Sequence, residues 1–158
     1  MVKRLAALCF LTFMLTACST ESGQEELRFS RVSYHLTGGI GGFDRQIQIG
    51  SDGSFSITEL GKPGPTGTLS TAEMNQLRKA IGRVDWGQIN SRYVNPRVAD
   101  AMFEALTVQI KGVEHRTLVS TGGLPPAELQ AVTETLRQIL DSHWRDKSFT
   151  PHRHGHGG

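Results

Sequence analysis

The fold is decided by residues 45–60, which read Arg45-Gln-Ile-Gln-Ile-Gly-Ser-Asp-Gly-Ser-Phe-Ser-Ile-Thr-Glu-Leu60. Ile47 and Ile49 alternate with polar residues before Ser-Asp-Gly, and Phe55 and Ile57 alternate after it. A period of two predicts a strand with one buried face. Because Asp-Gly between two such segments favours a tight reversal, the stretch predicts an antiparallel β-hairpin.

The same alternation predicts further strands on both sides of this hairpin. They fall at residues 32–36, 103–111 and 114–120, with a short extension at 66–69. Two connections lack such a pattern. Residues 61–67, Gly-Lys-Pro-Gly-Pro-Thr-Gly, are expected to form a plain turn-rich link, and residues 85–100 an irregular one.

Two helices are predicted after the first group of strands and after the last strand. Ser70-Thr-Ala-Glu73 is a capping box, followed by apolar residues at helical spacing. Pro125-Pro126 precedes the second apolar stripe, and prolines are tolerated at a helix start. The order of strands, helix, strands and helix predicts an α+β fold, an antiparallel β-sheet with two helices packed on one face.

The first residues are typical of a secretory signal. Lys3 and Arg4 precede an uncharged, mostly apolar run at residues 5–17, too short to span a bilayer comfortably. Leu-Thr-Ala-Cys at residues 15–18 resembles the lipobox of bacterial lipoproteins. We therefore expect a signal peptide at 1–17, acylation of Cys18 with fatty chains such as palmitate, and a linker at 18–28.

Charge and cysteine content exclude several classes of function. Removal of the expected signal peptide, residues 1–17, takes away Lys3 and Arg4. The remaining 141 residues carry 15 basic and 15 acidic side chains. A neutral chain without basic runs has no electrostatic footprint for nucleic acid. Cys9 leaves with the signal and Cys18 is expected to be alkylated, which excludes disulfides and cysteine-based sites in the folded domain. That domain is placed at residues 29–145.

No catalytic motif stands out. The chain has no Gly-x-Ser-x-Gly elbow, no His-Glu-x-x-His and no phosphate-binding glycine pattern, so we expect neither an enzyme nor a cofactor. His152, His154 and His156 alternate in the tail at residues 146–158. They are a weak candidate set for zinc, copper or nickel, and a solvated, disordered tail is the favoured interpretation.

The glycine run Gly38-Gly39-Ile40-Gly41-Gly42 is richer in glycine than a hairpin needs. It is either a loop that lies against another molecular surface or a simple flexible connection. The sequence does not choose between the two.

This run, with the motifs after it, resembles the emfourin family, in which Gly-Gly-x-x-Gly follows the first strand. Leu69-Ser-Thr-Ala-Glu-Met-x-x-Leu77 resembles the family's helix start, and residues 99–108 and 115–129 resemble its later strands and last helix. The resemblance covers residues 31–140. This chain departs from the family pattern in two places. Ala105 stands near a position where the family has an aromatic or other large residue, and the loop after Trp86 is long.

Emfourin-like proteins inhibit thermolysin-like zinc metalloproteases, so the resemblance implies an α+β inhibitor with such a protease as partner. Gly38, Gly39, Gly42 and Phe43 are the expected contact residues. The alternative is an envelope binding or assembly lipoprotein without inhibitory activity. Ser19 after Cys18 favours the outer membrane over the inner, so we expect a lipid-anchored protein of the cell envelope.

Overall fold

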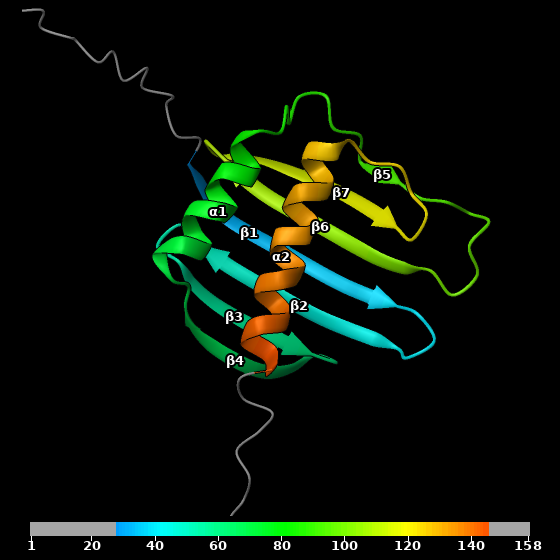
Figure 1. The fold of residues 1–158 in the computed structure, drawn as a ribbon, viewed down its shortest axis with the longest axis horizontal. Coiled ribbons are helices and arrows are strands. Elements are labelled where there is room, and N and C mark those ends of the chain that lie inside the picture. The colour runs from blue at the N-terminus through cyan, green and yellow to red at the C-terminus, as the bar shows by residue number, and fades with distance from the viewer. Residues whose placement is uncertain (1–27, 146–158) are drawn as a thin grey trace, which may run out of the picture.

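The computed structural model describes residues 28–145, which form a seven-stranded sheet and two helices (Figure 1). In chain order the elements are β1 (Phe29–Gly38), β2 (Phe43–Gly50), β3 (Ser54–Glu59), β4 (Lys62–Thr68), α1 (Thr71–Gly82), β5 (Arg92–Tyr93), β6 (Met102–Ile110), β7 (Val113–Ser120) and α2 (Ala127–Arg145). The predicted signal peptide, Cys18 and the histidine tail lie outside the described residues. Within residues 28–145, no helix has the length and apolar character needed to cross a bilayer.

The sheet has the order β4-β3-β2-β1-β6-β7-β5. Neighbouring strands are antiparallel, except that β5 pairs parallel with β7. The predicted hairpin forms in the expected register, with Ile47 opposite Ile57 and Ile49 opposite Phe55. β1 lies at the centre, where Tyr34 faces Ile47 on one side and Leu106 on the other. The predicted α+β fold class is confirmed.

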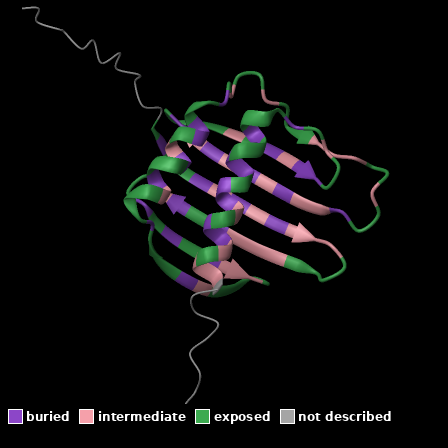
Figure 2. Ribbon diagram, viewed as in Figure 1, coloured by how far each residue is buried: buried purple, intermediate pink, exposed green. Residues whose placement is uncertain are grey.

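Both helices cover the same face of the sheet, and the core lies between these two layers (Figure 1). Buried and more exposed residues alternate along the central strands, as Figure 2 shows. The strands contribute Val32, Tyr34, Ile47, Ile49, Ile57, Leu106 and Val108, and the helices contribute Leu77, Ile81, Leu129, Leu136 and Leu140. Each such aliphatic side chain contributes about 1.5–3 kcal/mol by burial.

Local sequence signals fix where the helices begin. The Ser70 hydroxyl accepts a hydrogen bond from the Glu73 amide at 3.2 Å, and the Glu73 carboxylate accepts one from the Ser70 amide at 2.7 Å. The predicted capping box therefore starts α1. α2 begins after the proline pair, where the Gln130 amide donates to the Pro126 carbonyl at 3.0 Å.

The predicted turn at residues 61–67 is wrong, because this segment is strand β4 at one edge of the sheet. Proline is tolerated there because an edge strand leaves alternate amide positions without a partner. Gly64 is required by packing, since a Cβ on it would lie 2.9 Å from Cζ3 of Trp144. The two prolines made this segment look like a turn, but it is a strand that packs against α2.

Residues 85–100, expected to be irregular, also contain β5, which pairs parallel with the end of β7. The Leu118 amide donates to the Ser91 carbonyl at 3.0 Å, and the Thr117 hydroxyl donates to the Asn90 carbonyl at 2.9 Å. A strand of two residues is too short to show a period of two, so the sequence does not predict it.

Candidate functional site at the glycine-hairpin end

The glycine run forms the reversal between β1 and β2, and it lies against the segment that leads into β6. Gly38 has φ +92° and Gly39 has φ +70°, in the left-handed region that favours glycine. The Gly39 amide donates to the Ala101 carbonyl at 3.3 Å, and the Gly42 amide donates to the Gly39 carbonyl at 3.0 Å. These hydrogen bonds fasten the start of the loop to the segment before β6, and contact of the loop with another molecule stays a prediction.

Exposed apolar side chains concentrate at this end of the sheet. Ile40, at the tip of the loop, is 94% exposed, and Phe43, where β2 begins, is 41% exposed. Leu60 follows β3 at the same end, and Leu124 lies between β7 and α2; they are 64% and 89% exposed. Val113, the remaining exposed large apolar side chain among residues 28–145, lies at the opposite end, where β7 begins. Four of the five exposed large apolar side chains of the described residues thus lie at one end of the sheet, a distribution that favours an interaction surface there.

We call this surface, made of Ile40, Phe43, Leu60 and Leu124, the hairpin-end surface. Its base is ordered by polar contacts. The Arg45 guanidinium lies 5.6 Å from the centre of the Phe43 ring and 4.9 Å from that of Trp144. The same guanidinium donates to Glu59 Oε1 at 2.7 Å. The Arg45 guanidinium therefore positions the Phe43 ring. Glu59 on β3 and Trp144 on α2 hold that guanidinium in place.

A groove of about 920 Å³ borders the hairpin-end surface, between α2 and the ends of β1, β6 and β7. Its apolar lining includes Leu36, Met102, Val119 and Leu124, and its polar lining includes Gln130, Thr133, Glu134 and Arg137. Met102 also supports the loop, since a Cβ on Gly39 would lie 3.2 Å from its Cγ. The groove and the glycine loop are therefore parts of one surface.

A half-buried ion pair lines this groove. Glu104 on β6 is 9% exposed and bonds to Arg137 on α2, whose guanidinium also donates to Glu134 Oε2 at 2.7 Å. Burial acts to lower the pKa of Arg137, but the hydrogen bond and negative charge of Glu104 outweigh it and raise that pKa. The guanidinium is paired with two carboxylates, which disfavours the binding of an anionic ligand at this point.

Tyr34 lies beneath the pair. Burial, and secondly the negative charge of Glu104, raise the pKa of its phenol. Its hydroxyl is buried beside Glu104 and Arg137, close enough for their polar groups to act on its pKa, but it makes no hydrogen bond of good geometry among the described residues. The raised pKa keeps the phenol protonated at neutral pH.

Each histidine of the described chain has a local structural role. His35 lies 2.7 Å from Asp44 Oδ1, His143 lies 2.9 Å from Glu73 Oε1, and the His115 ring is 5.5 Å from that of Trp86. Among residues 28–145, no three potential metal ligands gather. His152, His154 and His156 lie outside the described residues, so their metal binding stays a prediction.

The structure brings together Gly38, Gly39, Gly42 and Phe43, the predicted contact residues, at one end of the sheet. The sequence did not predict that the exposed side chains of Ile40, Leu60 and Leu124 lie at the same end of the sheet. An isoleucine between two glycine pairs was a readable signal for Ile40. Leu60 and Leu124 come from other turns, and only the strand order brings those turns to the same end.

No protein-family model matches the chain, and no curated protein matches it.

Proposed function

We propose that this protein is an envelope-anchored inhibitor that binds a thermolysin-like metalloprotease through the hairpin-end surface. The observation that carries the proposal is the gathering of exposed apolar side chains around a glycine loop that its own backbone hydrogen bonds hold in place. The resemblance to emfourin supplies the class of partner.

A fixed loop favours binding because little conformational entropy is lost when the partner closes on it. Glycine also lets the backbone approach a protease cleft without side chains in the way. Ile40 and Phe43 add apolar area at the centre of such a contact, where interface energy is concentrated. The bordering groove extends the surface toward the area that stable complexes bury, roughly 800 Å² on each partner.

The direction of β1 fits an anchored inhibitor. Phe29 begins this strand at one end of the sheet, and Gly38 ends it beside the glycine loop. Ten extended residues span about 30 Å. An anchor at Cys18 would thus join the domain at the end far from the hairpin-end surface, leaving that surface free to meet a protease.

The test uses residues 19–158, which contain every core residue but lack Cys18 and therefore carry no lipid. This protein is titrated against thermolysin with excess zinc and calcium, so that chelation by the histidine tail cannot imitate inhibition. We expect loss of peptide hydrolysis at near-stoichiometric inhibitor.

Ile40→Asp is the decisive variant and Val113→Asp is its matched control, because both replace an exposed aliphatic side chain but at opposite ends of the sheet. We expect I40D to weaken inhibition at least about ten-fold, as loss of a central contact does, and V113D to leave it unchanged. Equal effects of the two variants would exclude the hairpin-end surface as the contact.

An unchanged rate with the parent protein, across several thermolysin-like enzymes, would contradict inhibition. The envelope-binding alternative then predicts that the same surface captures an envelope protein, with I40D releasing it and V113D retaining it.

A further inference from the structure

Three arginines lie at the end of the sheet opposite the hairpin-end surface: Arg28 and Arg31 at the start of β1, and Arg78 on α1 beside the turn between β2 and β3. The Arg78 guanidinium donates to the Ser51 carbonyl at 3.2 Å, and the Ser51 amide donates to the Ser30 carbonyl at 3.2 Å. Arg31 pairs with Gly50 in the β1–β2 register, immediately before Ser51. Arg28 precedes β1 by one residue. We call Arg28, Arg31 and Arg78 the arginine cluster.

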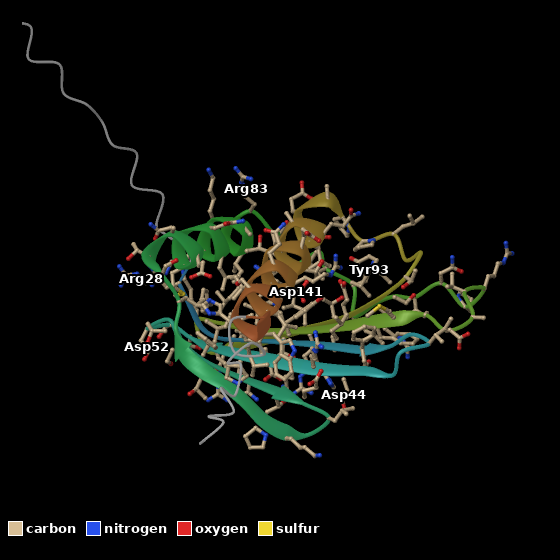
Figure 3. All side chains as sticks on the ribbon, turned by 60° about the horizontal axis from the view of Figure 1, so that its bottom comes forward. Arg28, Asp44, Asp52, Arg83, Tyr93 and Asp141 are labelled. Carbon is tan, nitrogen blue, oxygen red and sulfur yellow. The ribbon has the colours of Figure 1, made fainter. Side chains whose placement is uncertain are left out.

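No member of the arginine cluster forms an ion pair within the described part of the chain. Arg28 and Arg31 are exposed, and so are Lys79 and Arg83 on α1. Figure 3 shows Arg28 and Arg83 directed outward at the same end of the molecule. Arg31 projects from the face of the sheet without helices, whereas Lys79 and Arg83 lie on the α1 side, so only a partner that meets this end of the domain head-on can contact all of them. Exposed cations without an ion-pair partner are available to such an anionic surface.

Asp52 is the carboxylate that shares this turn. It accepts hydrogen bonds from the Ser54 hydroxyl at 2.7 Å and the Ser54 amide at 3.0 Å, and these bonds lower its pKa. The carboxylate is therefore engaged locally and is not paired with the arginines.

We propose that the arginine cluster, with Lys79 and Arg83, binds the anionic phosphate headgroups of a membrane surface. Guanidinium groups match phosphate oxygens through paired hydrogen bonds. Each cation near the membrane makes the free energy of binding to an anionic leaflet more favourable by a similar amount. Binding here would hold the anchored domain upright, with the hairpin-end surface directed away from the membrane.

The short distance along the chain between Cys18 and Arg28 favours a membrane as the partner, and this step rests on the lipidation in the proposed function. Residues 19–27 are the only connection between Cys18 and Arg28, and nine extended residues reach at most about 32 Å. A lipid on Cys18 would therefore let the arginine cluster reach the headgroups. Glu21, Glu25 and Glu26 in this connection oppose the attraction, so their charge is part of the test.

The experiment measures partition of residues 19–158, without lipid, onto vesicles of phosphatidylcholine alone or mixed with phosphatidylglycerol. We expect binding to the mixed vesicles only, with loss at high salt because exposed charges are screened. R28Q/R31Q should lower the partition coefficient about 25-fold, since each cation near the surface contributes about five-fold. E21Q/E25Q/E26Q should raise it.

The matched control is K62Q/R97Q, which removes two exposed cations at the hairpin end. This variant should bind vesicles as the parent does. Equal losses in both double variants would show attraction to net charge alone and would overturn the assignment. So would equal binding to neutral vesicles, or displacement by millimolar inorganic phosphate, which would indicate a discrete phosphate site instead of a surface.

Thermal unfolding of each variant confirms that the fold is retained. R28Q/R31Q should inhibit the protease as well as the parent, because the two ends are independent. Vesicle binding without protease inhibition would refute the proposed function and leave the membrane contact standing.

Discussion

Gly38 and Ala101 are in backbone contact: a Cβ on Gly38 would lie 2.5 Å from the Ala101 carbonyl oxygen. The neighbouring Gly39 amide donates to the same oxygen at 3.3 Å. The glycine loop is thus fastened to the segment before β6 by an approach that a side chain would prevent. We expect the conformation of the glycine loop to depend on this contact.

Gly38→Ala is therefore expected to destabilise the fold strongly. The added methyl group would meet a backbone atom, and φ +92° is strained for any other residue. We expect a loss of about 2 kcal/mol or more in the free energy of unfolding, measured by urea denaturation. Gly42→Ala is the control, since φ is +61° and nothing lies within 4 Å of its Cβ.

G42A should cost only about 1 kcal/mol, from the left-handed conformation alone. Equal losses for the two variants would mean that the approach to Ala101 does not constrain the loop.

Glu73 should couple stability to pH. Partial burial acts to raise its pKa, but hydrogen bonds from Ser70 and the contact with His143 outweigh it, so the pKa lies below its ordinary value of 4.5. A depressed carboxyl pKa gives stability that is present above pH 4.5 and is lost as pH falls through the folded-state pKa. Urea unfolding at a series of pH values should therefore show stability falling below pH 4.5.

Glu73→Gln should flatten that decline, because glutamine still accepts the Ser70 hydrogen bond but does not titrate in this range. At neutral pH it should cost less than Ser70→Ala, for which we expect about 1 kcal/mol. The exposed Glu128→Gln serves as the comparison. A decline in E73Q as steep as in the parent would assign the acid sensitivity to other groups.

Local signals allowed much of the fold to be predicted. Asp52-Gly53 and the Ser70–Glu73 capping box are satisfied within a few residues, so they can be read from the sequence. Most of β4, apart from the predicted extension at 66–69, was missed because its prolines signal a break unless the segment is known to lie at an edge. Its packing against Trp144, about 80 residues from Gly64, is a contact that no short-range pattern encodes.

The candidate site was predicted only in part, for the same reason. The glycine loop is contiguous and was identified. The pairing of Glu104 with Arg137 joins β6 to α2, and the grouping of Ile40 with Leu60 and Leu124 joins three turns. These are consequences of strand order, and no short-range pattern encodes them.

Tyr34→Phe should be neutral or stabilising. The hydroxyl lies beside Glu104 and Arg137 but makes no hydrogen bond of good geometry in residues 28–145, so its desolvation cost is at most partly compensated. Phenylalanine keeps the ring that fills the centre of the core. We expect unfolding free energy to stay equal or rise by up to about 1 kcal/mol. A clear loss would mean that the hydroxyl stabilises the Glu104–Arg137 pair.

The Glu104–Arg137 pair gives the sharpest test of the core beneath the groove. Arg137→Met would leave the carboxylate of Glu104 unpaired in a site where its side chain is only 11% exposed. Fully buried pairs lose about 3–5 kcal/mol when one partner is removed. Because 40% of the Arg137 side chain is exposed and water can reach this end, we expect about 2 kcal/mol.

The double variant E104L/R137M should recover much of that loss, since an apolar pair leaves no unpaired charge under α2. Arg116→Met is the matched control at an exposed pair, where Arg116 and Glu114 are 74% and 46% exposed. It should cost less than about 0.5 kcal/mol, because water screens and solvates the remaining carboxylate. If R137M cost as little as R116M, Glu104 would be hydrated through the groove, and the pair would contribute to the shape of the surface without stabilising the fold.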